Sequence, residues 1–113
     1  MAYNEILGDR VREILSLHDN VIEKKMFGGL CFMLNDKMCV GIMKEKLMCR
    51  VDPEDIDSLL EKAGCSMMDF TGKPMKGFVL VDDTEIESHK DLKFWVDLCV
   101  SYNPLAQSSK KRR

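Results

Sequence analysis

The spacing of hydrophobic residues changes several times along the chain, and each change predicts a different element. An apolar stripe at helical spacing follows Asn4, a residue that suits a helix N-cap, and predicts a helix over residues 4–17. That stripe comprises Leu7, Val11, Ile14 and Leu15. Between residues 21 and 51, short apolar runs alternate with turn-forming residues, a pattern that predicts four antiparallel strands.

A second helix is predicted to begin at Asp52-Pro53, where a carboxylate N-cap precedes a proline at the first helical position. Its apolar stripe continues until Gly64, a residue that suits the left-handed position after a helix end. Residues 65–74 are less regular, whereas residues 75–81 alternate and predict a further strand.

The last helix is predicted to run from Ser88, which opens a capping-box-like pattern, to Asn103-Pro104, which stops it. The order helix, strands, helix, one or two strands, helix predicts the α+β class, with three helices packed on an antiparallel β-meander sheet in two layers. We expect one domain over residues 1–103 and a disordered basic tail over residues 104–113.

The two faces of the predicted sheet follow from its turns. We assume a two-residue turn at Asn35-Asp36 and a three-residue turn at residues 44–46. The core face then carries Leu30, Phe32, Leu34, Cys39, Gly41, Met43, Leu47, Cys49 and Val51. The opposite face carries Cys31, Met33, Met38, Val40, Ile42, Met48 and Arg50.

That opposite face is far more apolar than the solvent side of an ordinary two-layer domain, so something should cover it. One explanation is that helices of this chain lie on both faces. The other is an interface, because a methionine-rich apolar surface edged by an arginine is typical of a homodimer or partner site. On the second explanation, Val40→Glu or Met38→Glu leaves a folded monomer.

Charge is unevenly distributed along the 113 residues. The 17 Lys and Arg residues against 19 Asp and Glu give a net charge of -2. Four cations end the chain: Lys110, Lys111, Arg112 and Arg113. Without them the body carries about -6, which argues against a nucleic-acid-binding body and leaves a tail that suits phosphate or an acidic partner. No apolar run approaches the roughly 20 residues of a membrane-spanning helix.

The five cysteines predict reduced thiols in a cytoplasm, because their number is odd and we expect no secretory leader. Cys39 and Cys49, with Met43 nearby, form a soft set that suits copper(I), but we favour core packing and predict no metal and no cofactor. The chain carries none of the nucleophile or zinc-protease motifs, so we expect no enzymatic activity.

Two glycine-containing segments, residues 26–30 and 72–77, suit either tight turns or backbone cradles for an anion. Neither matches a phosphate-binding or dinucleotide-binding motif. We favour turn geometry as the reason for these glycines, and the alternative is a small anionic-ligand site or an uncharacterised enzyme. The cations that would converge on such a ligand are Lys25, Arg50, Lys73 and Lys76.

Several of these stretches together carry a family resemblance. They are Lys25-Met26-Phe27-Gly28-Gly29-Leu30, Phe32-Met33-Leu34-Asn35 with Lys37-Met38, Leu47-Met48-Cys49-Arg50-Val51, Met68-Asp69-Phe70-Thr71-Gly72-Lys73-Pro74-Met75-Lys76-Gly77-Phe78-Val79-Leu80-Val81 and, more loosely, Leu92 with Trp95-Val96. In this order they resemble the N-terminal domain of the TfoX/Sxy family, bacterial proteins named for regulators of natural competence. The resemblance implies a compact α+β domain without catalytic residues. In the competence regulators, which continue into a second helical domain, it implies activation of transcription through protein contacts.

We therefore expect a cytoplasmic, non-enzymatic interaction domain that contacts another protein or a second copy and is involved in transcription control. The residues expected to make the contact are those of the opposite sheet face, with Arg50 at its edge. The second interpretation is a ligand-binding domain or enzyme that uses Gly28-Gly29 and the segment from Lys73 to Gly77.

Overall fold

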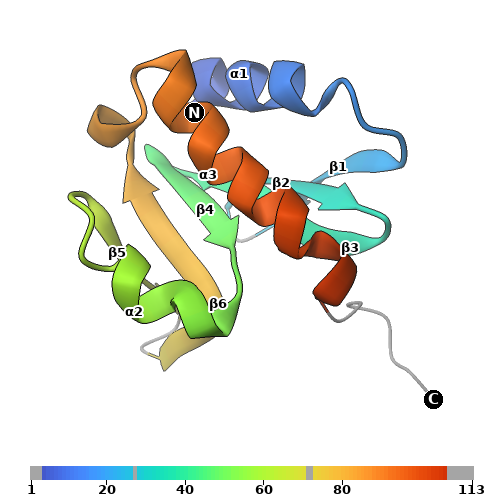
Figure 1. Ribbon diagram of the computed structural model, residues 1–113. Helices are drawn as coiled ribbons and strands as arrows, with labels where there is room; N and C mark the ends of the chain where they lie inside the picture. Colours follow the sequence, from blue (N-terminus) through green and yellow to red (C-terminus); the bar gives the residue numbers. More distant parts are fainter. Residues whose placement is uncertain (1–3, 27, 71–72, 107–113) are drawn as a thin grey trace.

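The structure is a computed structural model that describes residues 4–26, 28–70 and 73–106, and the side chains of these except 26, 68–70 and 73–76. Its centre is a six-stranded antiparallel sheet with the strand order β1-β2-β3-β4-β6-β5 (Figure 1). The strands are β1 (Val21–Met26), β2 (Gly29–Leu34), β3 (Lys37–Met43), β4 (Lys46–Arg50), β5 (Cys65–Phe70) and β6 (Lys73–Asp82). The four strands predicted between residues 21 and 51 are all present.

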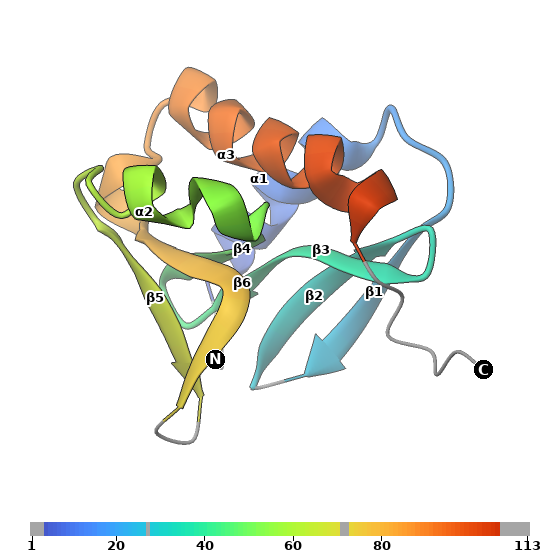
Figure 2. The ribbon, with the colours of Figure 1, turned by 60° about the horizontal axis from the view of Figure 1, so that its bottom comes forward.

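Three helices lie together on one side of this sheet, as Figure 2 shows. They are α1 (Glu5–Leu15), α2 (Ile56–Leu59) and α3 (His89–Tyr102). Short 3-10 turns occupy Pro53–Asp55, Asp83–Glu85 and Asn103–Leu105. The predicted α+β class, with three helices on an antiparallel sheet, is therefore confirmed.

The helix starts follow the predicted caps. The Asn4 side chain accepts a hydrogen bond from the Leu7 amide at 3.1 Å, and the Ser88 hydroxyl accepts one from the Asp91 amide at 3.1 Å. Each cap satisfies an amide that has no partner within its own helix. The second helix is shorter than predicted, because a 3-10 turn occupies Pro53–Asp55 and α2 already ends at Leu59.

Strand β5 replaces the less regular stretch expected over residues 65–74. Cys65 pairs with Val81 and Met67 with Val79, so both side chains face the helices and pack against the core. Two alternating positions are too few to signal a strand from sequence. The pairing with β6 supplies the backbone hydrogen bonds that hold this edge.

The hydrophobic core lies between the helix layer and the sheet. Leu7 and Val11 of α1 and Leu92 and Val96 of α3 pack on sheet residues such as Phe32, and all are at most 2% exposed. Burying an aliphatic side chain of this kind contributes about 1.5–3 kcal/mol, so the two long helices hold the sheet largely through these contacts.

The predicted register of β2 and β3 is correct near the turn and wrong beyond it. Met33 pairs with Met38, as expected, but Phe32 pairs with Val40 instead of Cys39 because the register shifts there at a β-bulge. Val40 and Ile42 consequently face the helices and belong to the core, with exposures of 1% and 0%. Their assignment to the opposite face was wrong.

A second deviation restores the register in β4. The turn after β3 contains only Lys44 and Glu45, with Lys44 at a φ of 56°, because Met43 pairs directly with Lys46. The turn is one residue shorter than predicted, and this offsets the one-residue bulge. Leu47 and Cys49 therefore face the core as predicted.

The C-terminal end of α3 is fixed to the β2–β3 turn through Asn103. Its side-chain amide donates to the Leu34 carbonyl at 3.0 Å and accepts from the Asn35 amide group at 3.2 Å, and Asn103 is only 2% exposed. Ala106 is also buried. The packed structure thus continues past residue 103, and the remaining predicted tail, residues 107–113, lies outside the described residues.

Candidate functional site

The sheet face turned away from the helices is the most unusual surface of this domain. In Figure 2 the β1–β2 and β5–β6 hairpins diverge on that side, opposite the helix layer. Its centre is a buried cluster of sulfur and aromatic side chains: Cys31, Met33, Met48 and Phe78. Met38, Met43 and Leu80 are partly buried and pack against the cluster. We call these seven residues the sulfur face.

Gly41 shapes the middle of the sulfur face. It lies between Cys31 on one neighbouring strand and Met48 on the other. A Cβ at Gly41 would lie 2.8 Å from the Met48 methyl carbon, 2.6 Å from the Leu30 carbonyl oxygen and 3.2 Å from the Cys31 Cα. The absence of a side chain there lets the Met48 thioether lie across the strand toward Cys31.

Arg50 lies at the edge of the sulfur face, as predicted. Its guanidinium carbon is 5.6 Å from the centre of the Phe78 ring, and its Nη1 donates to the Met38 carbonyl at 3.4 Å. That carbonyl is next to the β-bulge, where regular strand pairing is interrupted. Arg50 therefore ties β4 to β3 across the bulge and covers one side of the aromatic ring.

The rim of this face combines apolar and cationic side chains. Ile22 pairs with Met33 and is 50% exposed, and Lys24 pairs with Cys31 and is also exposed. Lys46 Nζ lies 3.3 Å from Asp82 Oδ1. With Arg50, the described part of this rim carries three cations and one carboxylate.

The thiols in the described structure are free and mostly buried. Burial raises the pKa of Cys31 to about 11 and also raises the pKa values of Cys39, Cys65 and Cys99. A thiol with a raised pKa stays protonated at neutral pH and is a poor nucleophile. Cys39 and Cys49 lie in the core as favoured from sequence, whereas Met43 is on the other face.

The structure does not assemble the predicted anion site from its described parts. Lys25 pairs with Leu30 and lies on the helix side of the edge strand β1, while Arg50 lies on the sulfur face of β4, three strands away. Gly29 approaches the end of β3 beside the Lys46 end of β4, and the Gly77 carbonyl accepts from the Val51 amide at the other end. The two glycine segments thus belong to different ends of β4.

Some predicted site residues fall outside what the structure describes. The backbone of Met26 ends β1, and the backbone of residues 73–76 forms part of β6, but their side chains lie outside the description. Phe27 and the basic tail also lie outside it: Lys110, Lys111, Arg112 and Arg113.

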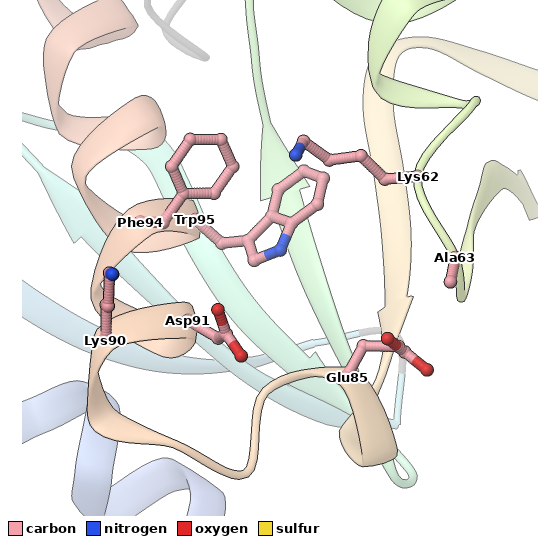
Figure 3. Close-up of a pocket in the computed structure, with 7 residues that line it drawn as sticks. All are labelled: Lys62, Ala63, Glu85, Lys90, Asp91, Phe94 and Trp95. Atoms are coloured by element: carbon pink, nitrogen blue, oxygen red, sulfur yellow. The ribbon is translucent and has the colours of Figure 1, made fainter.

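Sequence reasoning missed an open pocket of about 370 Å³ on the helix side (Figure 3). It is lined by Lys62, Ala63, Glu85, Lys90, Asp91, Phe94 and Trp95. The Lys62 ammonium lies 4.8 Å from the centre of the Phe94 ring, so the pocket already holds its own cation over its exposed aromatic face. Charges of both signs line it, and this mixture favours neither an anion nor a cation.

Within the described residues no three His, Cys, Asp or Glu side chains gather into a metal-binding group. No helix in the described ranges has the length and apolar character needed to cross a membrane.

One antiparallel sheet, three helices on a single side and an apolar opposite face define a two-layer α+β domain. The family model of the TfoX N-terminal domain matches residues 13–102, and this chain belongs to that family. This confirms the resemblance found in the sequence. No curated protein and no solved structure matches the chain significantly.

Proposed function

We propose that this TfoX N-terminal domain is a non-enzymatic module that binds a partner protein at the rim of the sulfur face and acts in transcription control. The observation that carries the proposal is the apolar and cationic rim beside the buried cluster. Ile22 is half exposed and Met38 is partly exposed there, and both lie among cations. Exposed apolar groups next to charges are typical of transient protein interfaces.

The chemistry of the rim indicates the kind of partner. Lys24 and Arg50 add positive charge, and Lys46 is paired with Asp82. A segment that presents acidic side chains around an apolar anchor complements this surface in charge and in polarity. Burial raises the pKa values of the Cys31 and Cys39 thiols, and a thiol with a raised pKa is a poor nucleophile at neutral pH, which supports a non-enzymatic role.

The test places a photo-crosslinking amino acid at Ile22 in cells, with Ile6 as the matched control position. Ile6 is 73% exposed and lies on α1, in the helix layer. We expect a partner to be crosslinked from position 22 and not from position 6. Identification of the adduct by mass spectrometry then shows whether the partner is a transcription protein.

Binding of the purified partner is then measured by calorimetry for the unmodified chain and for Met38→Glu, Ile22→Glu and Ile6→Glu. We expect the first two variants to weaken binding at least about tenfold, since each places a carboxylate where an acidic partner docks, and Ile6→Glu to bind normally. Binding should also weaken as salt is added. Equal affinity of all variants would refute the rim as the docking surface, and a partner unconnected with transcription would refute that part alone.

A further inference from the structure

The buried centre of the sulfur face gathers soft ligand atoms that the interaction proposal does not use. The Cys31 Sγ atom lies 4.0 Å from the Met33 Sδ atom, the thiol being positioned to donate to the thioether. Met48 belongs to the same buried cluster, and the side chains of Met38 and Met43 pack against it. A free thiol and several thioethers are the ligands that a soft metal ion prefers.

The spacing of the two sulfur atoms suits a shared metal. A metal–sulfur bond is about 2.3 Å long. Two sulfurs bound to one ion therefore lie about 3.8–4.0 Å apart in tetrahedral or trigonal geometry, and Cys31 and Met33 are separated by 4.0 Å. Little movement of either side chain is needed to bridge them.

Gly41 leaves room for the side chain of the third ligand, Met48. Because it separates Cys31 from Met48 across the sheet and has no side chain, the Met48 thioether can lie over the strand between them. An alanine at this position would meet the Met48 methyl group. Cys31 of β2 and Met48 of β4 therefore lie on the same face of the sheet, on either side of Gly41.

The charge of the site selects a monovalent ion. Cys31 is 1% exposed, Met33 4% and Met48 2%, so any ion here is largely desolvated. One thiolate and neutral thioethers around a single positive charge sum to zero, whereas a divalent ion would leave an uncompensated buried charge. Burial keeps the Cys31 thiol protonated in the free chain by raising its pKa to about 11, and the positive charges of Arg50 and Lys24 oppose this rise only in part.

We propose that Cys31, Met33 and Met48 form a binding site for one copper(I) ion. Binding replaces the thiol proton of Cys31 with the metal and releases that proton to solvent, and the thioethers bind without losing a proton. Met38 and Met43 are partly exposed at the edge of the cluster, and their thioethers bind the ion on its way from the surface to the site. The site goes beyond the proposed interaction function and does not depend on it.

The other cysteines offer a rival site that the experiment must separate. Cys99 is in contact with Cys49, and both lie in the core between α3 and the sheet. Two thiolates there would leave a negative charge around copper(I) in an apolar core, and Cys99 is only 1% exposed. Cys99→Ala therefore serves as a control that removes a buried thiol and keeps the sulfur face.

The experiment titrates the reduced full chain, freed of thiol reductant and oxygen, against the coloured complex of copper(I) with bicinchoninate. We expect the unmodified protein and Cys99→Ala each to withdraw one equivalent of copper(I). Cys31→Ala combined with Met33→Leu should lose at least about a hundredfold in affinity, and Met48→Leu at least about tenfold. Met67→Leu, which alters a methionine on the helix side, should bind normally.

A second measurement guards against variants that fail to fold. Met33→Leu nearly conserves volume, so this single variant should unfold in urea close to the unmodified protein and still bind copper(I) less tightly. One equivalent of copper(I) should raise the melting temperature of the unmodified chain and of Cys99→Ala, and not that of the double variant. Uptake that survives in the double variant, uptake lost in Cys99→Ala, or no uptake by the folded protein would overturn the site.

Discussion

Replacing Asn103 by alanine tests whether the end of α3 is held by hydrogen bonds. The substitution removes the amide that donates to the Leu34 carbonyl at 3.0 Å and accepts from Asn35 at 3.2 Å. Asn35 is exposed, so water can replace its lost partner. The Leu34 carbonyl lies in the buried surroundings of Asn103, where water does not replace the lost amide. The two lost hydrogen bonds contribute about 0.5–1.5 kcal/mol each, so we expect a total loss of about 1–3 kcal/mol.

The assay is equilibrium unfolding in urea followed by tryptophan fluorescence. Trp95 is the single tryptophan and is 4% exposed, so its emission reports the packing of α3 on the sheet. With a urea dependence of about 2 kcal/mol per molar, the midpoint should fall by about 1 M. Ser101→Ala, an exposed change near the same helix end, should stay within about 0.5 kcal/mol of the unmodified protein.

The reasoning fails if Asn103→Ala shifts the midpoint by no more than Ser101→Ala does while the slope is unchanged. That result would mean that packing alone holds the helix end. A changed slope would instead show that the variant alters the compactness of the folded or unfolded state.

Three further outcomes follow from the described contacts. Arg12 lowers the pKa of Glu23, so the ion pair stabilises the fold above the ordinary glutamate pKa and this contribution is lost as pH falls through the lowered value. Glu23→Gln should therefore cost about 0.2–1 kcal/mol in urea unfolding at pH 7 and almost nothing at about pH 3, and a pH-independent difference would contradict the pairing. Ellman's reagent should label one thiol quickly in the native chain, the half-buried Cys65, and Cys65→Ser should abolish that phase, whereas several fast thiols would contradict the burial. Val40→Glu should unfold the domain because Val40 is 1% exposed in the core, whereas Met38→Glu should stay folded, as circular dichroism will show. A folded Val40→Glu protein would contradict the bulge.

The fold class was predictable because the local signals agree with one another. The caps at Asn4 and Ser88 form as predicted, and the four strands between residues 21 and 51 lie where their turn residues place them. Asn35 and Asp36 both have positive φ values, 54° and 66°, which is the geometry of the two-residue turn that set the register.

The face assignments show where sequence reasoning stops. A bulge adds one residue to β3 and carries no marker in the apolar pattern, so Val40 and Ile42 were placed on the wrong side. The following turn is one residue shorter than predicted. The faces of β4 are therefore predicted correctly only because this second error offsets the first. Alternation predicts faces only as far as the next irregularity in pairing.

The sequence predicts which side chains share the candidate face, but not how deeply the centre of that face is buried. Met33, Met48 and Arg50 share one face as expected, yet the centre of that face is buried within the chain rather than open. The sequence contains no signal for this burial, since it arises from how the hairpins are set in space. The close approach of Cys31 to Met33 depends on rotamers, which residue spacing alone does not define.

The order in which the elements are synthesised has a consequence for the nascent chain. The entire sheet is complete at Asp82, but α3, which contributes Leu92, Trp95 and Val96 to the core, begins only at His89. A nascent chain that has just reached Ser88 therefore possesses every strand and still lacks the helix that seals them. The part of the sheet that α3 covers stays exposed to water until that helix is made, and a growing chain with exposed apolar surface is prone to aggregate.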